Sequence, residues 1–535
     1  MFKSNAAGKW SRVGGVLIGV MATALALTSC TPTIKHVSKA TATTTALSDN
    51  AQFAKGGCQF SLGAGFVEGQ NVTCGYVSVP ADHSNPRGAK IRLAVVIFKN
   101  PSAHRAPDPV IFLQGGPGGR VIQDFAPAMI TGADPGNGQI SLPIQFGNHD
   151  LIMVDQRGTG FSQPSLQCPE VANLQYQTDV NLTAQQQADE QNQQLDVCHK
   201  RLVGQGINLN EYTSLSDAAD IHDLISALGY TQVDLYGVSY GTRLALEIMR
   251  SYPQGIRSVV LDSTVPAQSH LLLSVPTSTA RVFNVLFQGC AADAHCNSTY
   301  PHLDKTFYSL VTQLNAHPAT FQTTDFSSGK SYTVLFNGDS LVSLLFDAFY
   351  ATPFIPYLPQ MIGEANQGNY THLVTLLYGA LQFDDSVSWG DYYSVECAED
   401  VSHVTADQVT AAAQAYPPAI RQDQLIGLEA EIPGCSLWNV TSAPASESQP
   451  VSSSIPTIVL EGEYDPITPP ANGALAAQTL STSYQFQFPG SGHGVFLSVF
   501  SPGNCPATIV NAFWSHPNTK PDGSCINLMT EPQFQ

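Results

Sequence analysis

Charged residues are scarce in this sequence, and basic residues are the scarcest. Only 12% of its 535 residues are charged, and 23 Lys and Arg stand against 42 Asp and Glu. A nucleic-acid-binding protein needs a basic face to neutralise phosphates, so this composition excludes nucleic acid as a partner. The sequence also lacks Cys-x-x-Cys pairs and clusters of histidine, which are the usual patterns of a metal site. We therefore expect no metal and no cofactor.

The apolar run at residues 13–27 is too short to span a membrane. It follows Lys3, Lys9 and Arg12 and leads into the sequence LTSC, which ends at Cys30. A basic head, a short apolar core and small residues before a cysteine are typical of an exported bacterial protein, and LTSC resembles a lipobox. We expect residues 1–30 to be a lipoprotein-type signal peptide with Cys30 lipidated. The alternative is a plain secretory peptide with an incidental cysteine.

Residues 31–54 are rich in Thr, Ser and Ala without periodicity, which is typical of a flexible tether. A single lipid anchor would hold the protein at a membrane surface without making it integral. We expect an exported protein that is periplasmic or lipid-anchored to the outer face of a bacterial membrane. Its membrane contact would come only from the anchor, and its oligomeric state stays open.

The remaining cysteines lie in pairs that are close in sequence. In an exported protein this pattern predicts a set of local disulfides. The sequence does not prove the connectivity, and a metal site is the competing interpretation. The pairs are Cys58 and Cys74, Cys168 and Cys198, Cys290 and Cys296, Cys397 and Cys435, and Cys505 and Cys525.

Several short apolar runs follow one another along the chain. Unbroken runs of this length suit strands that are buried on both faces, as in a parallel sheet. Before them, alternating residues 71–80 and 90–98 predict an antiparallel hairpin. From Ser216, apolar residues at helical spacing end at Gly229 and predict a helix. The predicted buried strands are residues 109–113, 151–154, 233–238, 258–262, 456–460 and 484–488.

The alternation of strands and helices predicts an α/β protein with a mostly parallel, doubly wound sheet. Residues 163–212 are polar and predict a helical excursion from the sheet. Few strand-like runs occur over 267–450, which we interpret as a mainly helical insertion. The sheet would then be built from two parts of the chain, residues 55–266 and 451–535.

Ser239 stands in a Gly-x-Ser-x-Gly sequence between a predicted strand and a predicted helix. Gly237 and Gly241 leave room for the sharp turn, because a Cβ at either position would meet a neighbouring strand or helix. The turn holds the serine in a strained backbone with its hydroxyl exposed at the edge of the sheet. The helix N-terminus behind it favours developing negative charge. We predict that Ser239 is a nucleophile.

A serine nucleophile needs a base and a third group that orients the base. Asp465 and His493 each follow a predicted strand, and the order Ser239, Asp465, His493 is that of a catalytic triad in α/β-hydrolases. Alone, the aspartate would be interpreted as a helix cap or turn residue and the histidine as a surface or core group. Together, each after its strand, they predict a triad.

The glycine-rich loop at residues 114–119 has a separate predicted task. Attack on a carbonyl creates an oxyanion that needs two N–H donors, and glycines let the backbone approach closely. We expect those donors to be the N–H groups of Gly116 and Tyr240. The alternative is a tight turn without chemistry.

Five motifs together resemble the prolyl and tripeptidyl aminopeptidase family of α/β-hydrolases, especially its long, exported bacterial branch. The resemblance covers roughly residues 57–525 and is thinnest in the insertion. It implies an α/β-hydrolase that releases a single residue or a tripeptide from free peptide N-termini. The motifs are GGPGG (115–119), DQRGTGFS (155–162), GVSYGT (237–242), EGEYDPITP (461–469) and GSGHG (490–494).

The resemblance also implies a carboxylate that holds the ammonium group of the substrate, because a charged amine leaving water requires a paired partner. The sequence SVECAED, residues 394–400, is similar to the acidic segment of the family. Glu399 is our first choice for this carboxylate and Glu396 the second. The alternative is a solvated acidic turn beside Cys397.

Two other functions remain open at this stage. An esterase or lipase would use the same chemistry on acyl esters instead of peptides. A non-catalytic binding lipoprotein would keep only the hydrolase scaffold. The number of residues released and the side-chain preference at the cleaved bond also stay open.

Overall fold

The computed structural model describes residues 51–535 except 64, 132–145, 177–178, 181, 325–330, 382–385, 498–503 and 531. The expected signal peptide with Cys30 and the expected tether up to residue 50 lie outside the described residues.

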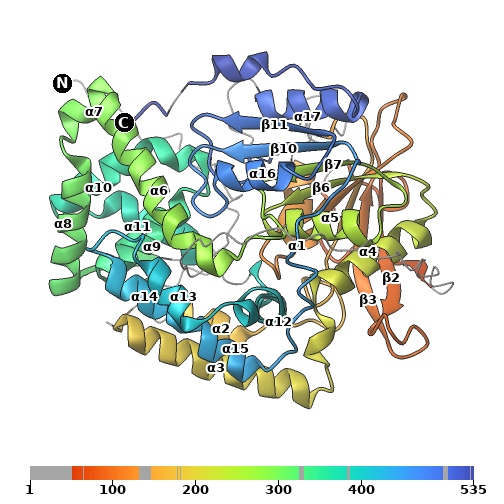
Figure 1. The fold of residues 1–535 in the computed structure, drawn as a ribbon, viewed down its shortest axis with the longest axis horizontal. Helices are drawn as coiled ribbons and strands as arrows, with labels where there is room; N and C mark the ends of the chain where they lie inside the picture. Colours follow the sequence, from red (N-terminus) through yellow and green to blue (C-terminus); the bar gives the residue numbers. More distant parts are fainter. Residues whose placement is uncertain are drawn as a thin grey trace, which may run out of the picture.

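A nine-stranded sheet forms the centre of the molecule, in the order β1-β2-β3-β5-β4-β6-β7-β10-β11 (Figure 1). From β5 to β11 every neighbouring pair is parallel, whereas β1, β2, β3 and β5 pair antiparallel. The predicted mostly parallel sheet is therefore confirmed. The strands are β1 (Gln52–Lys55), β2 (Val72–Pro80), β3 (Lys90–Phe98), β4 (Val110–Leu113), β5 (Leu151–Val154), β6 (Val233–Val238), β7 (Ile256–Asp262), β10 (Thr457–Gly462) and β11 (Ser483–Phe488).

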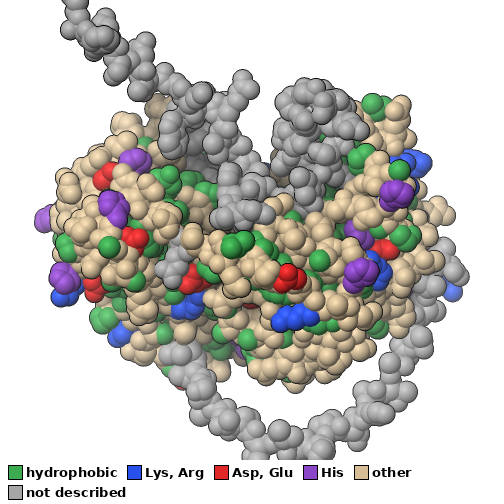
Figure 2. All heavy atoms as spheres, turned by 90° about the horizontal axis from the view of Figure 1, so that it is seen from above, with side chains coloured by type: hydrophobic (Ala, Val, Ile, Leu, Met, Phe, Trp, Pro, Cys, Tyr) green, Lys and Arg blue, Asp and Glu red, His purple; other side chains and the backbone are tan. Residues whose placement is uncertain are grey.

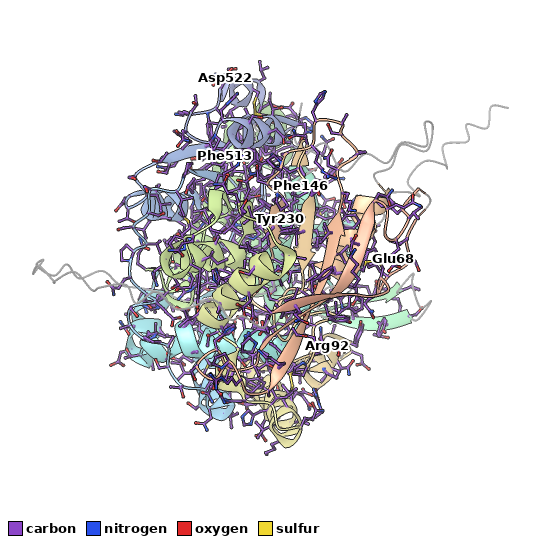
Figure 3. The ribbon with its side chains drawn as sticks, turned by 90° about the vertical axis from the view of Figure 1, so that its right-hand side faces the viewer. Glu68, Arg92, Phe146, Tyr230, Phe513 and Asp522 are labelled. Carbon is purple, nitrogen blue, oxygen red and sulfur yellow. A yellow bond between two sulfur atoms is a disulfide. The ribbon has the colours of Figure 1, made fainter. Side chains whose placement is uncertain are left out.

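The antiparallel edge of the sheet contains the predicted hairpin, because β2 and β3 pair along their whole length. Figure 3 views the molecule from this side and shows Arg92 on β3. The prediction that the tether extends to residue 54 is wrong, since β1 begins at Gln52 and pairs with β2 opposite Ser78. The outer edge of β2 offers unpaired N–H and C=O groups, and β1 pairs with them.

Helices cover both faces of the sheet. Side chains of α4, α5 and α16 pack on one face, and those of α1 and α17 pack on the other. Helix α4 begins after Thr213, whose side chain accepts the Ser216 N–H, and ends at Gly229, whose φ of 76° suits a glycine. These helices are α1 (Ile122–Thr131), α4 (Ser214–Leu228), α5 (Tyr240–Ser251), α16 (Pro470–Ala477) and α17 (Cys505–Ser515).

The insertion between β7 and β10 is mainly helical, as predicted, and its helices lie to the left of and below the sheet in Figure 1. It also contains a hairpin that the sequence analysis did not predict, β8 (Ala319–Thr324) with β9 (Ser331–Phe336). The helices are α6 (Leu271–Ala292), α7 (Ala294–Thr299), α8 (Leu303–Ala316), α9 (Gly338–Ala348), α10 (Leu358–Asn366), α11 (Thr371–Leu381), α12 (Trp389–Glu399), α13 (Ala406–Ala413), α14 (Arg421–Glu429) and α15 (Glu431–Trp438).

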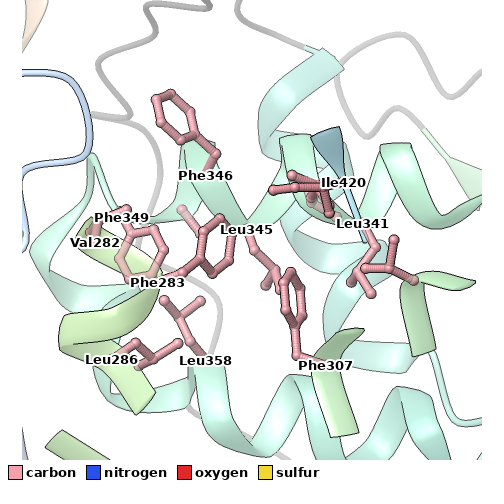
Figure 4. Close-up of a cluster of buried hydrophobic side chains, with 14 of the residues drawn as sticks. Val282, Phe283, Leu286, Phe307, Leu341, Leu345, Phe346, Phe349, Leu358 and Ile420 are labelled. Atoms are coloured by element: carbon pink, nitrogen blue, oxygen red, sulfur yellow. The ribbon is translucent and has the colours of Figure 1, made fainter. Parts of the chain in front are cut away.

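The insertion has its own hydrophobic core. Figure 4 shows part of it, where Phe283 of α6 stacks on Phe307 of α8 at 4.8 Å between ring centroids and meets Phe349 edge-on. All three rings are fully buried. Burial of aromatic side chains of this size contributes strongly to folding. The helices are therefore held as one packed layer beside the sheet.

The predicted helical excursion consists of α2 (Pro169–Ala172) and α3 (Ala184–Gly204), with three-residue and four-residue turns of 3-10 helix around them. Helix α3 packs against α14 and α15 of the insertion, as Figure 1 also shows. Leu195 and Leu202 of α3 share a buried cluster with Tyr393 and Trp438 from the insertion. The excursion and the insertion thus pack together although they are far apart in sequence.

Five disulfides join the cysteine pairs that the sequence analysis predicted, including Cys397–Cys435 between α12 and α15. Disulfides of this number indicate a compartment outside the reducing cytoplasm. Among the described residues, no helix combines the length and apolarity that crossing a membrane requires. On the face seen in Figure 2, Lys and Arg side chains are scattered and form no basic patch.

Candidate active site

Ser239 occupies a sharp turn between β6 and α5. Its φ of 57° and ψ of −129° are strained for a residue with a side chain. A Cβ on Gly237 would lie 2.4 Å from the carbonyl oxygen of Gly241, and a Cβ on Gly241 would lie 2.0 Å from that of Leu113. The two glycines therefore let α5 pack close to β6 and β4, as predicted.

The glycine-rich loop lies directly against this serine. A Cβ on Gly115 would lie 2.6 Å from the Cβ of Ser239. Gly116 has a φ of 119°, which a residue with a side chain rarely adopts, and it lines the same pocket as Ser239 and Tyr240. The N–H groups of Gly116 and Tyr240 donate no hydrogen bond to a described residue, so both are available to an incoming oxygen.

Asp155 anchors the segment that follows the glycine-rich loop. Its Oδ1 accepts the N–H groups of Val121 and Ile122 at the start of α1, and its Oδ2 accepts that of Phe161. Burial raises the pKa of Asp155 to about 6, although these hydrogen bonds act against the rise. Asp155 is the first residue of the DQRGTGFS motif, and the sequence alone did not predict a role for it.

The insertion also contacts the glycine-rich loop through the main chain. The N–H of Ser388 donates to the carbonyl of Gly118 at 2.8 Å, and the N–H of Arg120 donates to the carbonyl of Ser386. Helix α12 begins one residue after Ser388. The start of α12 is thereby fixed to the loop that faces Ser239.

Asp465 and His493 meet at the carboxyl ends of β10 and β11. Nδ1 of His493 lies 2.8 Å from Oδ2 of Asp465, and both side chains are buried. Asp465 also accepts the Ile467 N–H and both the N–H and the hydroxyl of Thr468. Burial alone would raise the pKa of Asp465, but the charge and hydrogen bond of His493, with hydrogen bonds from the Thr468 N–H and the Ser263 side chain, outweigh burial and lower it.

The other nitrogen of His493, Nε2, is buried and has no hydrogen bond with a described residue. The structure therefore contains no hydrogen bond between Nε2 and Ser239 Oγ. The histidine loop is nevertheless anchored beside the serine turn, because Asp262 at the end of β7 accepts the N–H groups of Val495 and Phe496 and also, through its carbonyl, that of Ser239. Catalytic hydrogen bonds are often long in free enzymes and shorten when substrate binds.

A pocket opens at Ser239 and is walled on one side by α12. Its lining combines apolar side chains, including Val265, Val395 and Ile467, with the carboxylates of Glu396 and Glu399. The predicted nucleophile, the predicted oxyanion donors and the two predicted amine-binding glutamates thus line one pocket.

The two glutamates differ in what they contact. Glu399 is 2% exposed, and its carboxylate accepts the N–H and the hydroxyl of Ser214 at 2.6 and 2.7 Å, while Arg243 lies 3.2 Å away. Glu396 is partly exposed and forms no hydrogen bond or ion pair with the described residues. Burial, together with the Asp400 carboxylate, raises the pKa of Glu396.

Ser214 and Arg243 were missed by the sequence analysis. The hydroxyl of Ser214 is 2.8 Å from that of Tyr240, so it links the residue after the nucleophile to Glu399. No sequence motif marks either residue. Ser214 is 185 positions from Glu399, and its sequence context is typical of the start of a helix. The position of Arg243, four residues after Ser239 on a helix, was the available clue.

Two groups of described residues have side chains of the metal-binding type close together. One consists of a disulfide-bonded cysteine pair and a glutamate, and the other consists of Asp108, His149 and Asp234 at the amino ends of the strands. In the second group, Nε of Arg257 is 2.9 Å from Oδ2 of Asp108, and Nη1 of the same guanidinium is 3.6 Å from Oδ1 of Asp234. The guanidinium supplies the positive charge that these carboxylates require, so nothing in this arrangement requires a cation.

Comparisons with known proteins agree with this architecture. Residues 108–498 match the model of a family described as the alpha/beta hydrolase fold. The chain is 25% identical to the serine protease Hip1 of Mycobacterium tuberculosis over 480 residues, which cover 84% of this chain and 86% of the relative. It is 29% identical to a tripeptidyl aminopeptidase of Streptomyces lividans over 201 residues, about a third of each chain (36% and 35%).

Among solved structures, a proline iminopeptidase of Mycobacterium smegmatis is 16% identical, with a TM-score of 0.37 over 83% of this chain and 98% of that one. This similarity is too low to support an argument about function. The family match extends over more than half of the chain and includes Ser239, Asp465 and His493. The chain belongs to the α/β-hydrolase family and is a serine hydrolase distantly related to serine proteases and tripeptidyl aminopeptidases.

Proposed function

We propose that this protein is an exported serine peptidase that releases a single residue or a tripeptide from the free N-termini of peptides. Ser239 Oγ attacks the carbonyl carbon while His493 Nε2 takes the hydroxyl proton, and Asp465 orients the imidazole. The N–H groups of Gly116 and Tyr240 stabilise the oxyanion. His493 returns the proton to the leaving amine, and water that it then deprotonates hydrolyses the acyl ester.

The observation that carries the peptidase assignment is the carboxylate of Glu396, which lines the pocket of Ser239 and has no hydrogen bond or ion pair with any described residue. A carboxylate without an internal partner can pair with the ammonium of a peptide N-terminus, which loses water when it enters a pocket. Glu399 is the second residue of the proposed amine site. Its hydrogen bonds to Ser214 give Glu396 the more direct role. The two relatives described above, a serine protease and a tripeptidyl aminopeptidase, support a peptide substrate.

We also propose a separate function for each part of the chain. Residues 52–266 and 451–535 supply the sheet and the triad, and residues 267–450 cover the site and restrict it to chain ends. Residues 1–30 direct export, and Cys30 carries the lipid anchor, which a tether at 31–51 joins to the sheet. Partition of the native protein and of Cys30→Ser between detergent and aqueous phases tests the anchor. The native protein should enter the detergent phase, and the variant should not.

The experiment that tests the function compares three kinds of chromogenic substrate. Aminoacyl and tripeptidyl nitroanilides with free N-termini should be hydrolysed, whereas the same amides with an acetylated N-terminus should not. Hydrolysis of nitrophenyl esters measures the activity of the triad on substrates that carry no amine. Hydrolysis of esters alone would identify an esterase and contradict the peptidase assignment. Ser239→Ala should abolish every activity.

A further inference from the structure

Arg243 is a buried cation in the wall of the pocket that Ser239 lines. It lies on α5, four residues after Ser239, and is 8% exposed. Its Nε is 3.2 Å from Oε2 of Glu399 at the end of α12. The proposed triad, oxyanion donors and amine site do not include this guanidinium.

Apart from Nε, the donors of Arg243 have no acceptor among the described residues. A guanidinium has five N–H groups. Beyond the ion pair with Glu399, the described part of the chain supplies this one with no hydrogen-bond acceptor, and its Nη2 is fully buried without a partner. A buried charged donor without an acceptor is strongly unfavourable. An oxygen from outside the chain is therefore expected to lie against Arg243 when the pocket is filled.

The charges around Arg243 determine whether this oxygen belongs to a carboxylate or to an uncharged carbonyl. Burial disfavours the charged guanidinium, but the carboxylates of Glu399, Asp400 and Glu396 outweigh burial and raise the pKa of Arg243. Asp400 is turned toward the start of α6, where it accepts the Leu272 N–H and contacts His270. Three carboxylates around one guanidinium would repel a fourth. An uncharged carbonyl oxygen fits this site better than a carboxylate.

We propose that Arg243 binds a main-chain carbonyl oxygen of the peptide substrate other than the one that Ser239 attacks. The inference rests on the proposed function, in which Glu396 holds the ammonium of the substrate. A single aminoacyl group contains only the attacked carbonyl. A substrate with two or more residues before the cleaved bond carries at least one more carbonyl along the same pocket. Arg243 thus favours the longer substrates, and Glu399 orients Arg243 through Nε.

The test measures kcat/KM of wild type and Arg243→Lys on alanyl, dialanyl and trialanyl nitroanilides with free N-termini and on nitrophenyl acetate. Lysine keeps the positive charge beside Glu399. It has a single nitrogen, so it cannot place one nitrogen on Glu399 and a second on the substrate carbonyl as a guanidinium can. A double variant, R243Q/E399Q, removes both charges, so it controls for an uncompensated carboxylate. Arg250→Lys is the matched control, because Arg250 lies on the same helix and pairs with Glu247 away from the pocket.

Arg243→Lys should lower kcat/KM for dialanyl and trialanyl substrates about tenfold or more, while alanyl nitroanilide and nitrophenyl acetate change less than about threefold. In the double variant, which also changes the amine site, kcat/KM for dialanyl and trialanyl substrates should fall about tenfold or more relative to that for alanyl nitroanilide. Equal losses on all substrates, or no loss on the longer ones, would overturn the inference. If wild type cleaves only the ester, the proposed function itself fails. If wild type cleaves free-amine amides but Arg243→Lys matches it, only the Arg243 inference fails.

Discussion

The imidazole of His493 and the carboxylate of Asp465 are joined by a hydrogen bond of 2.8 Å between Nδ1 and Oδ2, in a site where both side chains are buried. This contact fixes which ring nitrogen is free to face the serine. Thr468 strengthens it, since its hydroxyl donates to the same carboxylate oxygen at 2.8 Å. The arrangement leaves Nε2 as the nitrogen that can act as a base.

Asp465→Asn should lower kcat about 10³-fold to 10⁴-fold on esters and amides alike. The amide cannot stabilise the imidazolium and favours the wrong tautomer of the ring. Steady-state kinetics on a nitrophenyl ester measures the loss. Asp407→Asn, an exposed carboxylate in the first turn of α13, is the matched control and should retain full activity. A loss below about tenfold in Asp465→Asn would contradict its role as the orienting group.

Glu396→Gln should raise KM for free-amine substrates about tenfold or more, because a charged hydrogen bond to the ammonium is lost. Turnover of nitrophenyl esters should stay within about twofold of wild type, since those substrates carry no amine. The comparison of KM on the two substrate classes measures the effect. Equal changes on both classes would show that Glu396 acts on the fold or the triad and not on the amine.

Glu399→Gln should destabilise the protein by about 3 kcal/mol, because it removes the charge that Arg243 and the N-terminus of α4 face in a buried site. The carboxylate joins α12 to α4 and α5 through Ser214 and Arg243. Urea unfolding monitored by circular dichroism measures the difference. A variant as stable as wild type, with only KM for free amines raised, would contradict this structural role and leave Glu399 only its part in the amine site.

Asp391→Asn should make the stability of the protein less dependent on pH. Burial raises the pKa of Asp391 to about 8, although Arg157 acts against the rise. A carboxyl with a raised pKa in the folded state keeps a proton that the unfolded chain loses, so its contribution to stability falls as pH rises from about 4 to about 8. Asparagine stays neutral throughout this range.

We therefore expect Asp391→Asn to exceed wild type in free energy of unfolding by about 2 kcal/mol or more near pH 8 and to match it near pH 4. Urea unfolding at the two pH values gives the comparison. Asp217 on α4 is also buried with no side-chain hydrogen bond to a described residue, and burial together with the Asp391 carboxylate raises its pKa. A constant difference between variant and wild type at both pH values would contradict the account.

Much of the fold was predictable because it depends on local patterns. Buried parallel strands such as β6 appear as unbroken apolar runs, and the residues that follow such strands meet at one edge of the sheet. That rule places Ser239, Asp465 and His493 at the same edge. The close cysteine pairs were predictable because exported proteins form disulfides.

The unpredicted features depend on contacts between distant segments. Strand β1 is short and mostly exposed, so its residues carry no apolar alternation and only pairing with β2 reveals it. Helix α3 packs on α14 and α15, which lie more than 200 positions later in the sequence. The hydrogen bond from Gln191 to the Tyr393 hydroxyl spans a similar separation of 202 positions. Glu399 was predicted to face the substrate, but in the structure its carboxylate accepts hydrogen bonds from Ser214. No sequence pattern indicates that Ser214 lies beside it. Such contacts follow from tertiary packing and have no short sequence pattern.

The central claim is that Ser239 is the nucleophile that His493 activates. Treatment of the folded protein with a fluorophosphonate, followed by peptide mass spectrometry, tests it most directly. We predict one adduct per chain on the peptide that contains Ser239, formed at least about 10³-fold more slowly in His493→Ala. An adduct at another serine, or full hydrolase activity in Ser239→Ala, would contradict it.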